Sequence, residues 1–146
     1  MSPDYKSIYF RNRYEVERPY SSPFIFSLEH LTDSTFFDRP FSIITAYNPQ
    51  NTILSRAQNQ ERNQQLYSSL YSKGYEILEA RGCLERHCEA GYLIYDISIS
   101  EALELALMYD QYAIFYNDTK CLKYVACESE EVIVEKRRER LSEPRP

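Results

Sequence analysis

The residues best suited to chemistry in this chain are amides and one carboxylate at positions predicted to be buried or at strand ends. Residues 55–73 form a predicted helix whose apolar stripe passes through Leu66. Counting backward along this stripe in steps of three and four residues leads to Asn63 and then to Asn59. A buried amide without a partner costs about 1–3 kcal/mol, so each needs hydrogen bonds from backbone, water or ligand. The two amides therefore either fix the loop that carries Asn48 or line a ligand pocket.

Three further polar residues lie at predicted strand ends. They are Asn48 after a strand at 41–47, Glu89 in the loop before a strand at 92–97, and Gln111 directly before a strand at 112–116. If the topology brings them to one sheet edge, they form a single ligand-binding cluster of Asn48, Asn59, Asn63, Glu89 and Gln111. Four amides and one carboxylate suit a sugar, base or amide ligand better than covalent chemistry, because no Ser–His or Cys–His pair accompanies them.

An enzymatic role for the same cluster depends on Glu89. This carboxylate would act as a general base, with the amides orienting a substrate and His87 assisting as a proton carrier. The simpler interpretation is a loop carboxylate in water beside a surface imidazole. Because the sequence offers no second firm catalytic group, the prediction leans toward a protein that is not an enzyme. Glu89 and His87 are its candidate catalytic residues.

Four cysteines are candidates for a metal site. In a chain without a secretory signal, thiols are expected to stay reduced. The two cysteine pairs have four and five intervening residues, whereas zinc knuckles usually separate their ligands by two to four. We predict no metal, and the less favoured alternative is zinc bound by Cys83, Cys88, Cys121 and Cys127.

Hydrophobic periodicity and turn residues place the elements that must position the cluster. Predicted strands span 13–18, 24–28, 41–47, 75–81, 92–97, 112–116 and 122–126, and predicted helices span 28–37, 55–73 and 98–108. From residue 41 onward the order contains the split β-α-β pattern. The predicted fold is therefore α+β: a two-layer sandwich with a mainly antiparallel sheet, helices on one face, and a ferredoxin-like β-α-β-β-α-β core plus extra strands.

The chain is predicted to form one α+β domain over residues 1–127, followed by a charged tail over 128–146. Four of the seven prolines lie within residues 1–40 and divide this part into short pieces, so we expect it to be irregular. Three apolar residues interrupt the tail at 132–134, where a short strand or helical turn is predicted.

Composition limits the possible partners. The 146 residues carry a net charge of −5 with both signs interspersed, which argues against duplex nucleic acid. Three glycines do not form a Gly-rich phosphate loop, and no cofactor is predicted. No run approaches the roughly 18 apolar residues of a membrane span, and no apolar leader is present, so we predict no membrane association and a cytoplasmic location.

The polar residues also form a recognisable series: Thr45-Ala46-Tyr47-Asn48-Pro49, then Asn59, Leu66, Glu89, Gln111 and Ala113. Through this series, and through Tyr9 and Tyr14 near the start, the chain resembles the bacterial domain of unknown function 3293 family from about Tyr9 to about Tyr124. It departs from the family pattern at Tyr47, where Trp is expected. The resemblance implies a small bacterial cytosolic protein, names no activity, and favours Asn48, Asn59, Glu89 and Gln111 as site residues.

Three functions follow from these observations. The first is non-catalytic binding of a polar small molecule, nucleotide- or sugar-like, by the Asn/Gln/Glu cluster. The second is a protein interaction module or homodimer that uses the 14 tyrosines and an exposed sheet edge. The third is a hydrolase or transferase that depends on Glu89.

Overall fold

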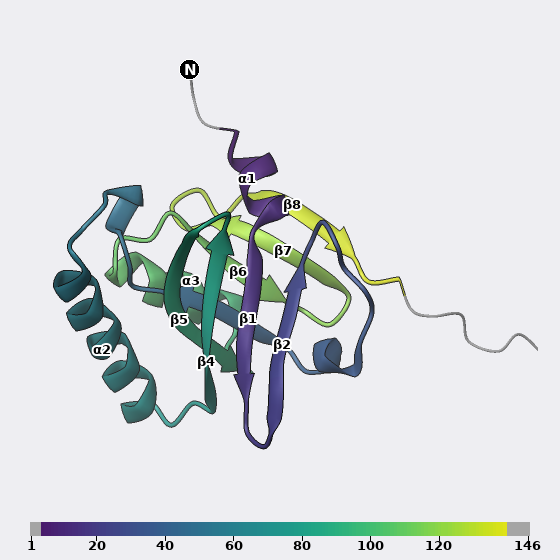
Figure 1. Ribbon diagram of the computed structural model, residues 1–146, viewed down its shortest axis with the longest axis horizontal. Helices are drawn as coiled ribbons and strands as arrows, with labels where there is room; N and C mark the ends of the chain where they lie inside the picture. Colours follow the sequence, from purple (N-terminus) through teal and green to yellow (C-terminus); the bar gives the residue numbers. More distant parts are fainter. Residues whose placement is uncertain (1–3, 140–146) are drawn as a thin grey trace, which may run out of the picture.

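The computed structural model describes residues 4–139 of the chain. Eight strands, three α-helices and two short 3-10 helices follow one another in this range (Figure 1). The helices are α1 (Tyr5–Arg11), α2 (Arg56–Ser72) and α3 (Ile99–Met108), and the 3-10 helices are η1 (Thr35–Asp38) and η2 (Pro49–Asn51). The strands are β1 (Arg13–Arg18), β2 (Ser21–Ser27), β3 (Phe41–Thr45), β4 (Ile77–Leu84), β5 (His87–Tyr95), β6 (Ala113–Asn117), β7 (Cys121–Ala126) and β8 (Val132–Arg137). Over the described range, no helix is both long and apolar enough to cross a membrane.

One antiparallel sheet contains all eight strands, in the order β2-β1-β4-β5-β3-β6-β7-β8. The sheet curls strongly, so that β1 and β2 lie in front of β6 and β7 (Figure 1). Ring contacts show that these strands face one another: Phe115 of β6 has its ring centroid 5.2 Å from Tyr14 of β1 and 5.4 Å from Phe26 of β2. Because β6 is not a sheet neighbour of β1 or β2, these rings meet across the interior of a half-barrel.

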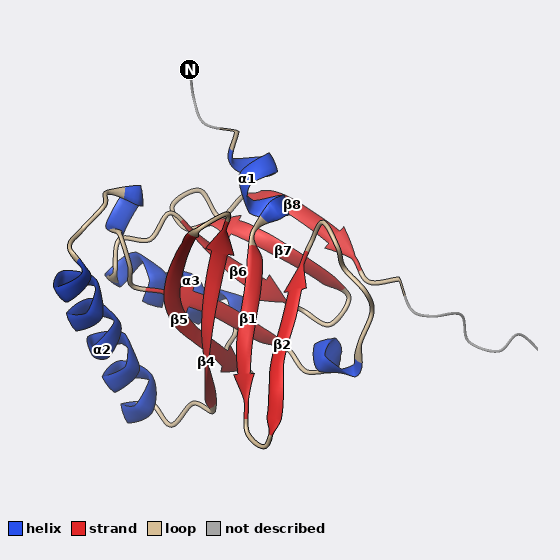
Figure 2. Cartoon of the chain, in the orientation of Figure 1, coloured by secondary structure: helices blue, strands red, loops and turns tan. Residues whose placement is uncertain are grey.

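The curl divides the core into two parts. Inside the half-barrel, aromatic side chains such as Phe37, Phe41 and Phe115 pack against one another. On the other face of the sheet, α2 and α3 bury a second cluster that includes Leu66 and Ile44 (Figure 2). Strand β3 is therefore buried on both faces, which explains why its sequence reads as a nearly continuous apolar run.

The prediction of an α+β fold built on an antiparallel sheet is confirmed. Strand β1 has its predicted span, and α2 begins after Ser55 with a capping box, in which Ser55 Oγ accepts from the Gln58 N–H and Gln58 Oε1 accepts from the Ser55 N–H. The apolar residues at 132–134 belong to strand β8, which pairs with β7. The end of the predicted charged tail, residues 140–146, lies outside the described residues.

The short helix predicted over 28–37 is wrong, because only the 3-10 helix η1 forms there. Leu28 and Phe37, whose spacing suggested a helix face, are buried inside the half-barrel at either end of the crossing from edge strand β2 to central strand β3. Helix α1 was not predicted. Its seven residues are too few for a clear period, and its N-cap is the Asp4 carboxylate, which accepts from the Ser7 N–H at 3.1 Å.

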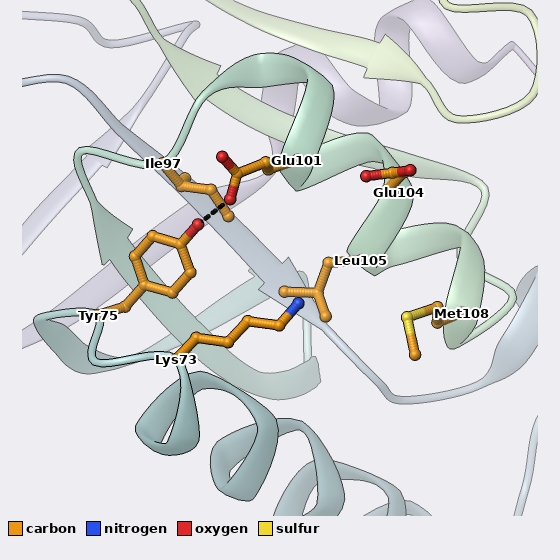
Figure 3. Close-up of a pocket in the computed structure, with 7 residues that line it drawn as sticks. All are labelled: Lys73, Tyr75, Ile97, Glu101, Glu104, Leu105 and Met108. Atoms are coloured by element: carbon orange, nitrogen blue, oxygen red, sulfur yellow. Dashed lines mark hydrogen bonds between the residues drawn. The ribbon is translucent and has the colours of Figure 1, made fainter.

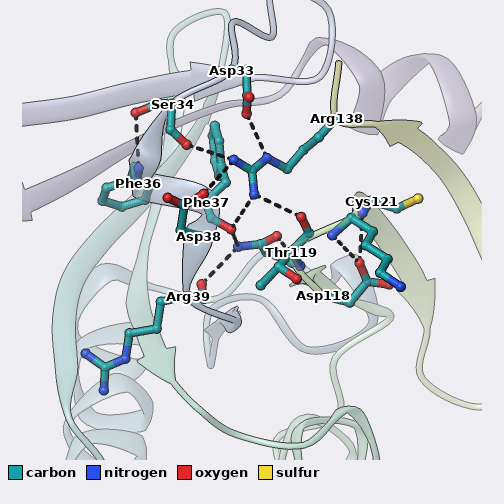
Figure 4. A network of polar contacts seen from close by, with 12 residues as sticks. Asp33, Ser34, Phe36, Phe37, Asp38, Arg39, Asp118, Thr119, Cys121 and Arg138 are labelled. Atoms are coloured by element: carbon teal, nitrogen blue, oxygen red, sulfur yellow. Dashed lines mark hydrogen bonds and ion pairs between the residues drawn. The ribbon is translucent and has the colours of Figure 1, made fainter. Parts of the chain in front are cut away.

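Arg138 fastens the end of β8 to the loop that precedes β3 (Figure 4). Its guanidinium donates to Asp33 Oδ1 at 2.7 Å and to Asp38 Oδ1 at 2.8 Å, and its side chain is only 5% exposed. The remaining donors reach backbone carbonyls of Ser34, Phe37 and Thr119. One planar side chain therefore satisfies five acceptors from two distant segments of the chain.

We expect Arg138→Met to lower the free energy of unfolding by about 3 kcal/mol, because it removes a largely shielded guanidinium that donates to two carboxylates and three backbone carbonyls. Urea denaturation followed by circular dichroism measures the change. Arg137→Met is the matched control, since Arg137 is the neighbouring arginine, at the end of β8, and is exposed. Equal losses in the two variants would contradict a structural role for the Arg138 network.

Candidate ligand-binding site

A cavity of about 370 Å³ lies at the end of the half-barrel that α1 covers. Six aromatic residues line it, and they come from α1, the concave face of the sheet and the segment before β6: Tyr5, Tyr9, Tyr14, Tyr112, Phe115 and Tyr124. Aliphatic residues and glycines add to this apolar lining, and six residues bring polar side chains: Asn12, Asn51, Thr45, His87, Glu89 and Gln111. An apolar cavity with a small number of convergent polar groups has the character of a small-molecule site.

Two ring stacks attach α1 to β7 and to the segment before β6, above this cavity. Tyr5 stacks on Tyr112 with ring centroids 4.5 Å apart, and Tyr9 stacks on Tyr124 at 4.6 Å. Burial raises the pKa of Tyr9 and of Tyr14 well above the usual range, and it raises the pKa of Tyr124 to about 12. These hydroxyls are therefore neutral at physiological pH. The Tyr124 hydroxyl accepts a hydrogen bond from Asn12 Nδ2 at 3.1 Å.

Glu89 provides the acidic group of the cavity, and the structure places it on β5 rather than in a loop. Its Oε2 accepts from Asn48 Nδ2 at 2.8 Å and lies 3.2 Å from His87 Nε2. Its Oε1 has no hydrogen-bond partner within residues 4–139. The Glu89 side chain is 30% exposed, whereas His87 is 65% exposed at the rim. One carboxylate oxygen is thus fixed by the protein and the other is available.

Asn48 and Asn59 form a reciprocal amide pair that positions Glu89. The Asn48 N–H donates to Asn59 Oδ1 at 2.9 Å, and Asn59 Nδ2 donates to Asn48 Oδ1 at the same distance. Asn48 Oδ1 also accepts from the Leu54 N–H at 2.9 Å. Asn48 has a φ of 45°, a left-handed conformation that Asn tolerates well. Of the two alternatives for Asn59, the structure thus shows it tying down the loop after β3.

Gln111 and Asn63 lie in different parts of the structure. Gln111 lines the cavity, and its Nε2 donates to the carbonyls of Tyr47 at 3.0 Å and Tyr109 at 3.2 Å. Asn63 lies on the outer face of the sheet, where its Nδ2 is 3.5 Å from the Tyr92 hydroxyl and its buried Oδ1 has no partner among the described residues. Of the five predicted residues, Glu89 and Gln111 line the cavity, Asn48 and Asn59 support Glu89, and Asn63 stands apart.

The tyrosine walls are the part of the site that residue patterns did not reveal. Two of these residues, Tyr5 and Tyr9, lie on the unpredicted helix α1, and Tyr124 comes from the far side of the curled sheet. The unusual number of tyrosines, 14 with no tryptophan, was the available signal. It indicates buried rings with polar edges but not where they gather.

The cysteines correct two expectations. Cys83 and Cys88 face each other on β4 and β5 and form a disulfide, so the expectation of reduced thiols is wrong for this pair. Cys121 and Cys127 are free, and burial raises the pKa of the Cys127 thiol to about 12. No three Cys, His, Asp or Glu side chains in the described range are placed to hold a metal ion. Zinc bound by all four cysteines is therefore wrong, because two of the sulfurs are bonded to each other.

A second cavity, of about 430 Å³, lies between the end of α2 and helix α3 (Figure 3). Tyr75 donates a hydrogen bond there to the Glu101 carboxylate, and this bond, with burial, raises the pKa of Tyr75 to about 12. Its lining includes Met108, which is 70% exposed, and none of the residues predicted for a site. The cavity under α1 is therefore the better candidate.

Fold and cavity together define a small α+β protein with a curled antiparallel sheet and a cavity lined in part by tyrosines. The model of the DUF3293 family, described as a protein of unknown function, matches residues 44–114. This match confirms the resemblance predicted from the sequence. No curated protein and no solved structure matches the chain. The matched range runs from β3 to β6, so it contains Asn48, Asn59, Glu89 and Gln111 but not the tyrosines of α1.

We expect Asn59→Ala to lower the free energy of unfolding by about 1–3 kcal/mol, because it leaves the buried Asn48 N–H without its acceptor and removes one of the two donors to Asn48 Oδ1. Asn63→Ala is the matched control on the same helix, since Asn63 holds one long contact and one unpaired oxygen. Urea denaturation of both variants measures the difference. If Asn63→Ala lowers the free energy of unfolding as much as Asn59→Ala does, the Asn48–Asn59 pair does not make the specific contribution to stability that we expect.

Proposed function

We propose that the protein binds a polar small molecule, without covalent chemistry, in the cavity under α1. The observation that carries this proposal is the combination of aromatic walls with a carboxylate oxygen, Glu89 Oε1, that has no partner within residues 4–139. A volume of about 370 Å³ falls at the small end of ligand pockets, which span roughly 300–1,000 Å³. This size suits a base-like or sugar-like molecule.

The lining residues favour binding over catalysis. Glu89 and His87 supply a carboxylate and an imidazole, but neither Ser nor Cys lines the cavity within the described range. The hydroxyl of Thr45 is already engaged, because it donates to the Ala90 carbonyl at 2.6 Å and accepts from the Tyr47 N–H at 3.0 Å. The cavity therefore offers no free Ser, Thr or Cys nucleophile paired with a base, which favours binding over acyl-transfer chemistry.

We also infer that the unit from β3 to β6 is a ferredoxin-like core. Its supporting observation is the strand order β4-β5-β3-β6 with α2 and α3 as the connections, which is the arrangement expected for a split β-α-β pair. Strands β1 and β2 extend one side of this unit, and β7 and β8 extend the other. A cytoplasmic location stays a prediction, and the Cys83–Cys88 disulfide argues against it.

A protein interaction module is the second candidate, and two surface features favour it. Tyr67 and Tyr71 stack on α2 with ring centroids 6.2 Å apart, and Tyr71 is 73% exposed. Ile25, on edge strand β2, is 56% exposed. Exposed aromatic and aliphatic side chains of this kind are common at protein interfaces.

For the first candidate, we expect nucleosides, monosaccharides or small amines in a screened panel to raise the melting temperature. A ligand at about 100 times its Kd adds about 2.7 kcal/mol to stability. Glu89→Gln should reduce the shift, and Glu79→Gln, an exposed carboxylate on β4, should not. Differential scanning fluorimetry measures both. No shift with any compound would overturn the small-molecule proposal.

For the second candidate, native mass spectrometry distinguishes the oligomeric states. A dimer that Tyr71→Ser converts to monomer, with folding unchanged by circular dichroism, is the expected result if α2 forms an interface. A wild-type monomer at high protein concentration would count against self-association through this surface.

A further inference from the structure

We propose that the ligand of the cavity under α1 is an organic cation, an ammonium or guanidinium group on a small apolar body, with Glu89 as its counter-ion. This inference rests on the proposed function and names the chemical class of the ligand. Three features of the protein support it: the charges that line the cavity, the arginine partners of other shielded carboxylates, and the tyrosine walls.

The charge of the cavity is unbalanced. Glu89 is the one acidic residue among the described lining residues, and none of them is Lys or Arg. The nearest basic group is His87, which lies at the rim with most of its side chain in solvent. A carboxylate against aromatic walls is costly unless a cation or several hydrogen-bond donors balance it. Oε1 has neither within residues 4–139.

Other shielded carboxylates of this protein are paired with arginine. Asp33, whose side chain is 14% exposed, receives the Arg138 guanidinium. Glu15, which is 15% exposed, accepts from both Arg81 and Arg13, and these hydrogen bonds lower its pKa. Glu89 receives an amide and an imidazole instead. The carboxylate that faces the cavity is thus left without a fixed cation, which is the arrangement a cationic ligand requires.

The tyrosine walls add attraction for a cation. Aromatic rings carry negative charge on their faces and attract ammonium and guanidinium groups within about 6 Å of the centroid. The phenol groups of Tyr9, Tyr14 and Tyr124 are neutral, since burial raises pKa values that already lie above physiological pH, so they remain hydrogen-bonding groups without adding a full charge. A phosphate, by contrast, would find no Lys or Arg among the described lining residues and would be repelled by Glu89.

The test compares cations with neutral molecules of the same shape by isothermal titration calorimetry at low ionic strength. The probes are choline against 3,3-dimethyl-1-butanol, and benzylammonium against benzyl alcohol. We expect at least one cation to bind about tenfold or more tightly than its neutral counterpart. Glu89→Gln should reduce this preference to about twofold or less, while Glu79→Gln should leave it unchanged.

Two further variants keep the outcome clear. Tyr5→Leu removes one aromatic ring from the cavity and leaves Glu89 unchanged. It should lower the affinity for the cations more than the affinity for the neutral probes. Ala113→Phe fills the cavity and should abolish binding of all probes, provided that circular dichroism shows the fold intact. Cation binding that persists in Glu89→Gln, or that survives the filled cavity, would overturn the assignment.

The two proposals can fail separately. If nucleosides, sugars or the neutral probes bind as tightly as the cations, and Ala113→Phe removes that binding, the cavity is a ligand site but the cation assignment is wrong. If neither the cations nor any neutral compound binds wild-type protein, both proposals fail.

Discussion

The curl of the eight-stranded sheet is the constraint on which the rest of the structure depends. It brings Phe115 of β6 against Tyr14 of β1 and Phe26 of β2, which a flat sheet in this strand order would hold far apart. The curl also creates an interior with two different ends. Phenylalanines fill the end near η1, and tyrosines surround the end under α1. Since a buried tyrosine must still satisfy its hydroxyl, this residue type suits an end that contacts water or a ligand.

Close backbone contact between β3 and β5 places Glu89 at that open end. Gly91 lies opposite Thr45, and a Cβ atom at position 91 would come within 2.4 Å of the Ile44 carbonyl oxygen. Glycine is therefore required there, because no flexible side chain could move aside. Two residues earlier on the same strand, Glu89 lies on the concave side, where it reaches the left-handed Asn48. The approach of two backbones thus fixes the position of the carboxylate.

Local signals in the sequence located most elements, and they singled out Glu89, His87 and Gln111, which line the cavity, but not its aromatic residues. The capping box at Ser55, the apolar run of β3 and the alternation in β1 each depend on residues close in sequence, so they could be predicted. The curl, the disulfide and the position of α1 depend on contacts between distant residues, which periodicity does not report. Helix spacing placed both Asn59 and Asn63 on a buried stripe, but it could not show that one meets Asn48 and the other Tyr92.

The link from Asn59 through Asn48 to Glu89 couples the site to the outer core. Asn59 lies in the second turn of α2, and this helix is held by Leu66 and Leu70 against the outer face of the sheet. Because Asn59 hydrogen-bonds to Asn48, the loop after β3 is held in place against this helix. Asn48 Nδ2 in turn donates to one oxygen of Glu89. An amide can do this without neutralising the carboxylate, whereas an arginine at the same place would cancel its charge. The protein thereby orients an acidic group while keeping its negative charge available to whatever enters the cavity.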